Sequence, residues 1–243
     1  MVSLVIHANG KIDHRAFMYD HLGTENGLSS QRVYSIEEDK YGGIWIAIKN
    51  GVARYNGRTL TNYTLGEADK RSDTGGMVIK LTKDSEDNIL AYNNKGEIFK
   101  YSEYLDRFIP IALQFTKRIN EIKKHGSGLI LQNVVVDKEN NLWAATSKGI
   151  FFVSIDGKTI KRHFDKLNIN CSVIVGQHLI ICTTSGVRLI DRNTGKYIRT
   201  LYNRNTESAF IDTQYHLLWL GTFNQGAVII DMKTWKKFGT RME

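Results

Sequence analysis

Three aspartates recur in this chain in the same local setting. Each stands six positions before a large apolar residue and twelve before a glycine: Asp39–Trp45–Gly51, Asp84–Leu90–Gly96 and Asp137–Trp143–Gly149. Paired carboxylates could act as general acid and base in the hydrolysis of a glycosidic bond. Each aspartate, however, opens a predicted turn, where its side chain can accept hydrogen bonds from backbone N–H groups. We therefore assign these residues a structural role and identify no catalytic pair.

Other catalytic and cofactor-binding patterns are missing from the sequence. We find no glycine-rich phosphate loop, no His-x-x-x-His metal pair and no nucleophile elbow. None of the seven histidines has the acidic neighbour and following proline of a phosphoacceptor helix, and the single proline is Pro110. The sequence thus predicts no catalytic residue, no metal ligand, no cofactor and no kinase motif.

The segments that carry the aspartates form a repeat. A fourth copy keeps only Ile180 to Gly186, and a stretched fifth copy runs from Asp212 to Gly226, with Trp219 in the place of the large apolar residue. Successive glycines stand roughly 40–50 residues apart, a period typical of propeller blades or paired helices.

The content of each copy favours a blade. In the first copy, short β-branched and aromatic runs at 33–36, 43–48, 52–55 and 59–63 alternate with turn sequences such as Asn-Gly. Amphipathic runs long enough for paired helices are mostly absent. We predict an all-β propeller of four-stranded blades, in which Trp45, Trp143 and Trp219 pack between neighbouring blades.

The first copy resembles the two-component regulator propeller repeat. The likeness rests on Glu25-Asn-Gly-Leu-Ser-Ser30, Val33-Tyr-Ser-Ile36, Asp39, Trp45-Ile46 and Arg54-Tyr-Asn-Gly57, and it extends with falling quality over residues 17–238. That family builds the extracellular sensor regions of hybrid two-component histidine kinases in Bacteroides-type bacteria. The resemblance implies a periplasmic or extracytoplasmic, non-catalytic input region that senses polysaccharide-derived oligosaccharides and signals as a homodimer.

About five blades are expected, at residues 17–64, 76–110, 128–163, 170–202 and 208–240. The family's propellers contain more blades, so we expect an incomplete propeller, although five blades could also close into a ring. Residues 1–16 resemble the end of a signal peptide or, equally well, an edge strand. No apolar run in the sequence reaches the length of a membrane-spanning helix.

Propeller geometry indicates which loops could bind a ligand. The hairpins between the second and third strands lie at the same end as the links between blades, and loops on a rigid scaffold tend to carry function. The candidate ligand-binding residues at this end are Lys49, Asn50, Asn94, Lys95, Lys117, Arg118, Ser147 and Lys148. The net charge of +8 suggests an acidic oligosaccharide, whereas a nucleic acid is not expected because no recognition motif accompanies the charge.

The sequence allows two other functions, and it allows Cys171 and Cys182 to be either bonded or free. The chain could be a stand-alone protein-binding scaffold. It could also process glycosides, because Asp39-x-x-Gly-x-x-Trp45 is close to the Asp-box of sialidase propellers, but with one extra residue and no identifiable nucleophile. Cys171 and Cys182 could pair across a hairpin or be buried as thiols.

Overall fold

The predicted blades are separate four-stranded antiparallel sheets in the computed structural model, which describes residues 21–238 except 50, 66–77, 94 and 125–127. A short 3-10 helix, η1 (Thr24–Asn26), precedes the first sheet. The predicted segment 1–16 lies outside the described residues.

Strands follow one another in space as they do in the sequence, so each sheet is a meander. The first two blades contain β1 (Val33–Glu38), β2 (Ile44–Ile48), β3 (Gly51–Tyr55), β4 (Leu60–Tyr63), β5 (Val78–Lys83), β6 (Ile89–Asn93), β7 (Ile98–Ser102) and β8 (Arg107–Ile111). The last three contain β9 (Leu131–Val136), β10 (Leu142–Thr146), β11 (Gly149–Val153), β12 (Ile160–His163), β13 (Ile169–Val175), β14 (His178–Thr183), β15 (Gly186–Asp191), β16 (Tyr197–Tyr202), β17 (Thr206–Asp212), β18 (Leu217–Thr222), β19 (Ala227–Asp231) and β20 (Lys236–Lys237).

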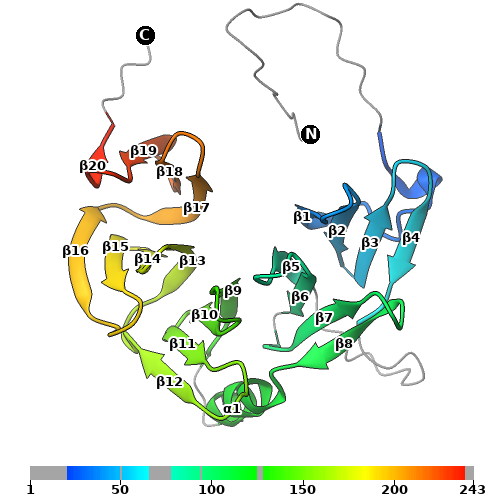
Figure 1. Ribbon diagram of the computed structural model, residues 1–243, viewed down its shortest axis with the longest axis horizontal. Coiled ribbons are helices and arrows are strands. Elements are labelled where there is room, and N and C mark those ends of the chain that lie inside the picture. Colours follow the sequence, from blue (N-terminus) through cyan, green and yellow to red (C-terminus); the bar gives the residue numbers. More distant parts are fainter. Residues whose placement is uncertain (1–20, 50, 66–77, 94, 125–127, 239–243) are drawn as a thin grey trace, which may run out of the picture.

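The five blades form an open arc rather than a closed ring (Figure 1). Their first strands, β1, β5, β9, β13 and β17, line the inner side, and each contacts the first strand of the next blade. The first and fifth blades stand at the two ends of the arc. The prediction of an all-β, incomplete propeller is therefore confirmed.

The repeated glycine is required by the close approach of two backbone segments. Gly149 has φ 98°, and a Cβ at this position would collide with the carbonyl oxygens of His163 and Phe164 at the end of the fourth strand. A Cβ on Gly51 or Gly186 would meet the equivalent carbonyl, that of Tyr63 or Tyr202. Only glycine combines a left-handed backbone with the absence of a Cβ. In each of these blades, the last residue of the fourth strand therefore packs against the hairpin between the second and third strands.

A β-bulge at the start of every inner strand was not predicted from the sequence. In each blade, one residue is skipped in the register between the first and second strands: Tyr34, Ile79, Gln132, Asn170 and Glu207. Bulges increase the local twist of a sheet. At the third and fourth blades, the inner strands are also joined by Ser172, whose N–H and hydroxyl both donate to Asn133 Oδ1 at 2.8 Å.

The hydrophobic core is divided into layers between neighbouring blades. Trp45 is 1% exposed and packs on Tyr101 and Phe108 of the second blade, with ring centroids 4.5 and 5.7 Å away. Trp143 is 3% exposed and belongs to the layer between the third and fourth blades. Cys171 and Cys182, opposite each other in register, are free buried thiols in the next layer.

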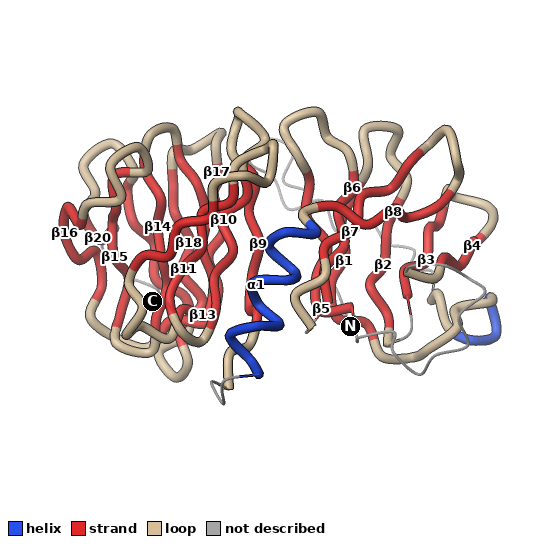
Figure 2. The backbone as a smooth tube through the Cα atoms, turned by 90° about the horizontal axis from the view of Figure 1, so that it is seen from below, coloured by secondary structure: helices blue, strands red, loops and turns tan. Residues whose placement is uncertain are grey.

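A helix replaces the missing tryptophan between the second and third blades. The segment that links these blades forms the 12-residue helix α1 (Leu113–Lys124). Figures 1 and 2 place it at the outer rim of the arc, between β8 and β12. Its Phe115 and Ile119 are fully buried beside Leu90, the residue that stands where the first, third and fifth blades have tryptophan. Since leucine is smaller than tryptophan, the helix supplies the volume that closes the layer.

The prediction that Trp219 packs between two blades is wrong, because this residue is 38% exposed. It occupies the same register position in β18 as Trp45 in β2, and its neighbour Phe210 in β17 is 66% exposed. No described blade covers this face of the fifth sheet. Phe238 follows β20 and is 54% exposed. The terminal face, defined by Phe210, Trp219 and Phe238, is thus an exposed apolar surface of the kind that drives association.

We predict that the terminal face makes the chain self-associate. The double variant Phe210→Glu/Trp219→Glu should remain monomeric, because charges remove the apolar contact, whereas the unmodified chain should gain mass with concentration. Light scattering after size exclusion measures both. Tyr104→Glu, which alters a 95% exposed tyrosine on a distant hairpin, is the matched control. A monomeric unmodified chain at all concentrations would contradict this prediction.

Candidate ligand-binding pocket at the junction of the first two blades

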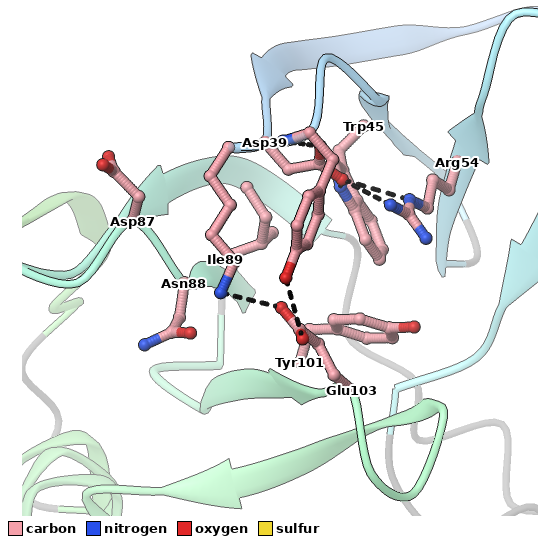
Figure 3. A pocket seen from close by; sticks show the side chains of 10 residues that line it. Asp39, Trp45, Arg54, Asp87, Asn88, Ile89, Tyr101 and Glu103 are labelled. Atoms are coloured by element: carbon pink, nitrogen blue, oxygen red, sulfur yellow. Dashed lines mark hydrogen bonds and ion pairs between the residues drawn. The ribbon is translucent and has the colours of Figure 1, made fainter.

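A pocket of about 290 Å³ lies where hairpins of the first and second blades meet (Figure 3). Three hairpins supply its rim: β1–β2, β5–β6 and β7–β8. The lining residues are Asp39, Lys40, Tyr41, Trp45, Arg54, Asp87, Asn88, Ile89, Tyr101 and Glu103. In a meander, these hairpins all lie at the same end of the blades, and the β2–β3 hairpins lie at the opposite end.

Asp39 organises the floor of the pocket. Its Oδ1 accepts hydrogen bonds from the backbone N–H groups of Tyr41 and Gly43 at 2.9 and 2.8 Å. Its Oδ2 accepts the Trp45 indole N–H at 2.7 Å and the Arg54 guanidinium at 2.8 and 3.1 Å. The guanidinium also lies over the Trp45 ring, 5.2 Å from its centroid. One carboxylate therefore fixes the turn, the buried indole and the cation beside it.

These contacts lower the pKa of the Asp39 carboxyl. Burial alone would raise that pKa, but the hydrogen bonds from Trp45, Gly43, Tyr41 and Arg54 favour the charged form and outweigh burial. The pKa of Asp84 is lowered in the same way: burial opposes ionisation, while Lys100, 2.8 Å away, and Asn88 favour it. Both side chains are only 7% exposed.

In the third copy, the cation beside the buried aspartate comes from the next blade. Arg54 and Lys100 stand at the same register position, opposite Trp45 and Leu90, but in the third blade this position is Phe152. Asp137 instead faces Arg192 of the fourth blade at 3.4 Å, and its Oδ2 accepts the Trp143 indole N–H at 3.2 Å. Arg192 also contacts Glu139 at 3.0 Å. The buried carboxylate thus has a cation in all three blades.

The rim of the pocket is held together across the two blades. Lys40 Nζ lies 3.0 Å from Glu103 Oε1, and the Tyr41 hydroxyl donates to Glu103 Oε2 at 3.4 Å (Figure 3). Below the rim, Tyr63 and Tyr101 both donate to Asp106 Oδ1, at 2.9 and 2.6 Å. Burial, followed by these contacts, raises the pKa of Tyr101, whose hydroxyl therefore stays protonated and donating.

Of the ligand-binding residues expected from the sequence, Lys49, Lys95, Ser147 and Lys148 lie in or beside the hairpins at the opposite end, and Lys117 and Arg118 lie on α1 at the outer rim. Lys49, Lys117, Arg118 and Lys148 are exposed, and Lys95 and Ser147 are half-buried. Asn50 and Asn94 lie outside the described residues. The Lys95 carbonyl accepts a hydrogen bond from Lys123 of α1, and the Lys148 carbonyl accepts one from Arg162, so both hairpins are packed against neighbouring elements.

Lys40, Tyr41 and Glu103 were not singled out from the sequence. Their positions could have been found by aligning the repeats, because the β1–β2 hairpin of one blade faces the hairpins of the next. Which side chains meet there depends on blade geometry. In the described residues, no group of three or more His, Cys, Asp or Glu side chains is arranged to hold a metal ion. Nor does any helix among them have the length and apolar character needed to cross a membrane.

Comparison with known proteins identifies the repeat. The family described as two component regulator propeller matches residues 27–50, which include β1, the Asp39 turn and β2. The first half of the first blade therefore matches the two-component regulator propeller repeat, and the resemblance noted from the sequence is confirmed. Among curated proteins, none matches the chain significantly.

Solved structures share the fold. The extracellular domain of a B. thetaiotaomicron protein assigned as a hybrid two-component system has 17% identity and a TM-score of 0.54, over 92% of this chain and 37% of that one. The extracellular domain of a second protein from this bacterium, assigned as a one-component system, has 20% identity and a TM-score of 0.54, over 88% and 36%. The computationally designed Ika8 protein has 9% identity and a TM-score of 0.59, over 86% and 61%. The chain spans a little over a third of the length of the two bacterial domains.

We predict that Asp39→Ala destabilises the chain by about 2–4 kcal/mol. The substitution removes the turn cap and leaves the buried Trp45 N–H without its acceptor, which costs about 1–3 kcal/mol for such a group. Urea unfolding followed by tryptophan fluorescence measures the change. Asp212→Ala is the matched control, since Asp212 occupies the same place in the fifth copy and accepts a bond from the exposed Tyr215 N–H. Equal losses in the two variants would contradict the assignment.

The lowered pKa of Asp39 and Asp84 predicts acid sensitivity. A carboxyl with a depressed pKa in the folded state adds stability above its unfolded pKa of about 3.9, and this contribution is lost as pH falls through the folded value. Unfolding free energy should therefore drop as pH is lowered below about 5. In Asp39→Asn, the drop measured by urea unfolding between pH 6 and 3 should be smaller. An unchanged pH profile in this variant would refute the prediction.

Proposed function

We propose that this chain is the ligand-sensing, non-catalytic input region of a two-component-type sensor, located outside the cytoplasm. The observation that carries the proposal is the two-component regulator propeller repeat in the first blade. The shared fold with two extracellular domains of sensor-type proteins supports it. The ligand, on this proposal, is an oligosaccharide released from a polysaccharide, and the complete sensor works as a homodimer.

The state of the repeated aspartates supports binding without catalysis. A general acid in glycoside hydrolysis needs a raised pKa so that it carries a proton at neutral pH. The pKa of Asp39 and that of Asp84 are lowered, and both carboxylates already accept bonds from the turn and from a cation. A lowered pKa is the opposite of what a proton donor in a sialidase-like or other glycosidase reaction requires, which favours a binding role for this region.

An inter-blade pocket suits a sensor for a mechanical reason. Signalling requires that ligand binding change the relation between parts of the protein, which is a coupling free energy between sites. A ligand held by the β1–β2 hairpin and the β7–β8 hairpin contacts two blades at once. Binding there would favour one relative position of the blades, and subunits attached to them could transmit that preference.

A protein-binding scaffold is the second candidate function. The terminal face of Phe210, Trp219 and Phe238 favours it, since a large exposed apolar surface marks a protein contact. The two functions differ in what is bound: a scaffold should bind a protein partner through this face and have no saccharide ligand.

We predict that the chain binds an oligosaccharide from a polysaccharide digest saturably and does not cleave it. The measurement is isothermal titration calorimetry with fractionated oligosaccharides, followed by chromatography of the recovered ligand. Recovery of the intact ligand supports an input region. If the protein still cleaves the ligand after it has been purified again, the chain is an enzyme. Absence of binding to any fraction would contradict the sensor proposal.

A further inference from the structure

The pocket between the first two blades has no surplus positive charge, although the chain as a whole is basic. Its lining holds three carboxylates, Asp39, Asp87 and Glu103, and two cations, Lys40 and Arg54. Both cations already contact a carboxylate, at 3.0 Å for Lys40–Glu103 and 2.8 Å for Arg54–Asp39. An acidic ligand would have to displace a protein carboxylate from its cation and then face it. Such like-charge contact is a common basis for rejecting a ligand.

The charges around the pocket rim do not change this balance. Lys83 contacts Asp87 at 3.7 Å and Glu37 at 3.5 Å, so this nearby cation is shared between two carboxylates. Asn88 contributes an amide that already donates to both oxygens of Asp84. The overall charge of +8 therefore does not describe this site, because none of the basic residues considered from the sequence lines the pocket.

The pocket presents aromatic surface beside hydrogen-bonding groups. Tyr41 is 68% exposed at the rim, and the half-buried Tyr101 forms part of the opposite wall. A tyrosine offers an apolar ring face and a polar tip. The C–H face of a sugar ring is also apolar, and its hydroxyl groups can donate to the Glu103 carboxylate and accept from the Lys40 ammonium. This combination matches an uncharged, polyhydroxylated ring.

The size of the pocket limits what it can hold. Its volume of about 290 Å³ stands at the lower limit of ordinary small-molecule sites, which begin at roughly 300 Å³. One sugar ring fits such a space, and a longer chain would continue over the exposed rim near Tyr41.

We infer that this pocket binds a single uncharged sugar unit of the ligand, with Tyr41 stacking on its ring and Glu103 accepting its hydroxyls. The inference rests on the proposed sensor function and names the site and the ligand class. The sugar occupies the space beside the Lys40–Glu103 ion pair, so it contacts the first and second blades together. The acidic oligosaccharide suggested by net charge is replaced by a neutral one at this site.

The test uses the full chain and neutral di- and trisaccharides of glucose, galactose, mannose, xylose and arabinose, each titrated at low and high salt. The corresponding glucuronic and galacturonic acid oligomers are titrated in parallel. The best neutral ligand is then titrated against Tyr41→Ala and Glu103→Gln. Tyr104→Ala is the matched control, because Tyr104 is an exposed tyrosine that follows Glu103 in the β7–β8 hairpin and does not line the pocket. Thermal unfolding of each variant verifies that it is folded.

The expected result is at least tenfold weaker binding of the neutral ligand by Tyr41→Ala and by Glu103→Gln, with no change in Tyr104→Ala. The uronic acid counterparts should bind at least tenfold more weakly at both salt concentrations. Tighter binding of the uronic acids, weakened by salt, would overturn the inference. Neutral binding that is unaffected by both variants would also overturn the site but leave the sensor function standing. Absence of saccharide binding by the unmodified chain would overturn both.

Discussion

The structure depends on one packing constraint: each blade is apolar on both faces, so every face needs a neighbouring element to cover it. Trp45 meets this need between the first and second blades, and Trp143 does so between the third and fourth. Between the second and third, Leu90 is too small, and α1 inserts Phe115 and Ile119. At the end of the arc, no described element covers Trp219, and the same repeat position becomes an exposed apolar surface. Full closure would remove such an end.

The buried aspartates link this packing to the loops. Asp39 caps its turn and holds the indole that fills the layer, so the shape of the hairpin and the packing of the blade are set by one carboxylate. A cation neutralises that carboxylate in each of the first three blades, whether it comes from the third strand or, at Asp137, from the next blade. At Asp39 and Asp84, the carboxylate oxygens are thus engaged in structural contacts. This arrangement also gives the first two blades a rigid rim on which Lys40, Tyr41 and Glu103 meet.

The sequence predicted the repeat and the four-stranded blades, because glycine, aspartate and tryptophan spacings reflect contacts within one blade. The incomplete propeller was expected from the larger number of blades in the family it resembles, not from these spacings. The sequence did not predict α1, since Phe115 and Ile119 acquire their role only when Leu90 leaves space in a neighbouring sheet. Trp219 is exposed because no blade among the described residues covers its face of the fifth sheet, and local spacing does not encode such long-range packing. The pocket was missed for a similar reason: Tyr41 and Glu103 are 62 positions apart, and only the packing of two blades brings them together. Net charge could not locate this pocket, because it carries no information on where charged residues lie in the fold.

The most direct test of the account is a hydrogen-exchange footprint of the chain with and without its best saccharide ligand. If the junction of the first two blades is the sensing site, binding should slow exchange in the hairpins at 39–43, 84–88 and 103–106. Exchange in α1 and in the 147–148 hairpin should stay unchanged. Slower exchange confined to α1 and to the hairpins β2–β3, β6–β7 and β10–β11 would place the ligand away from this junction and contradict the account.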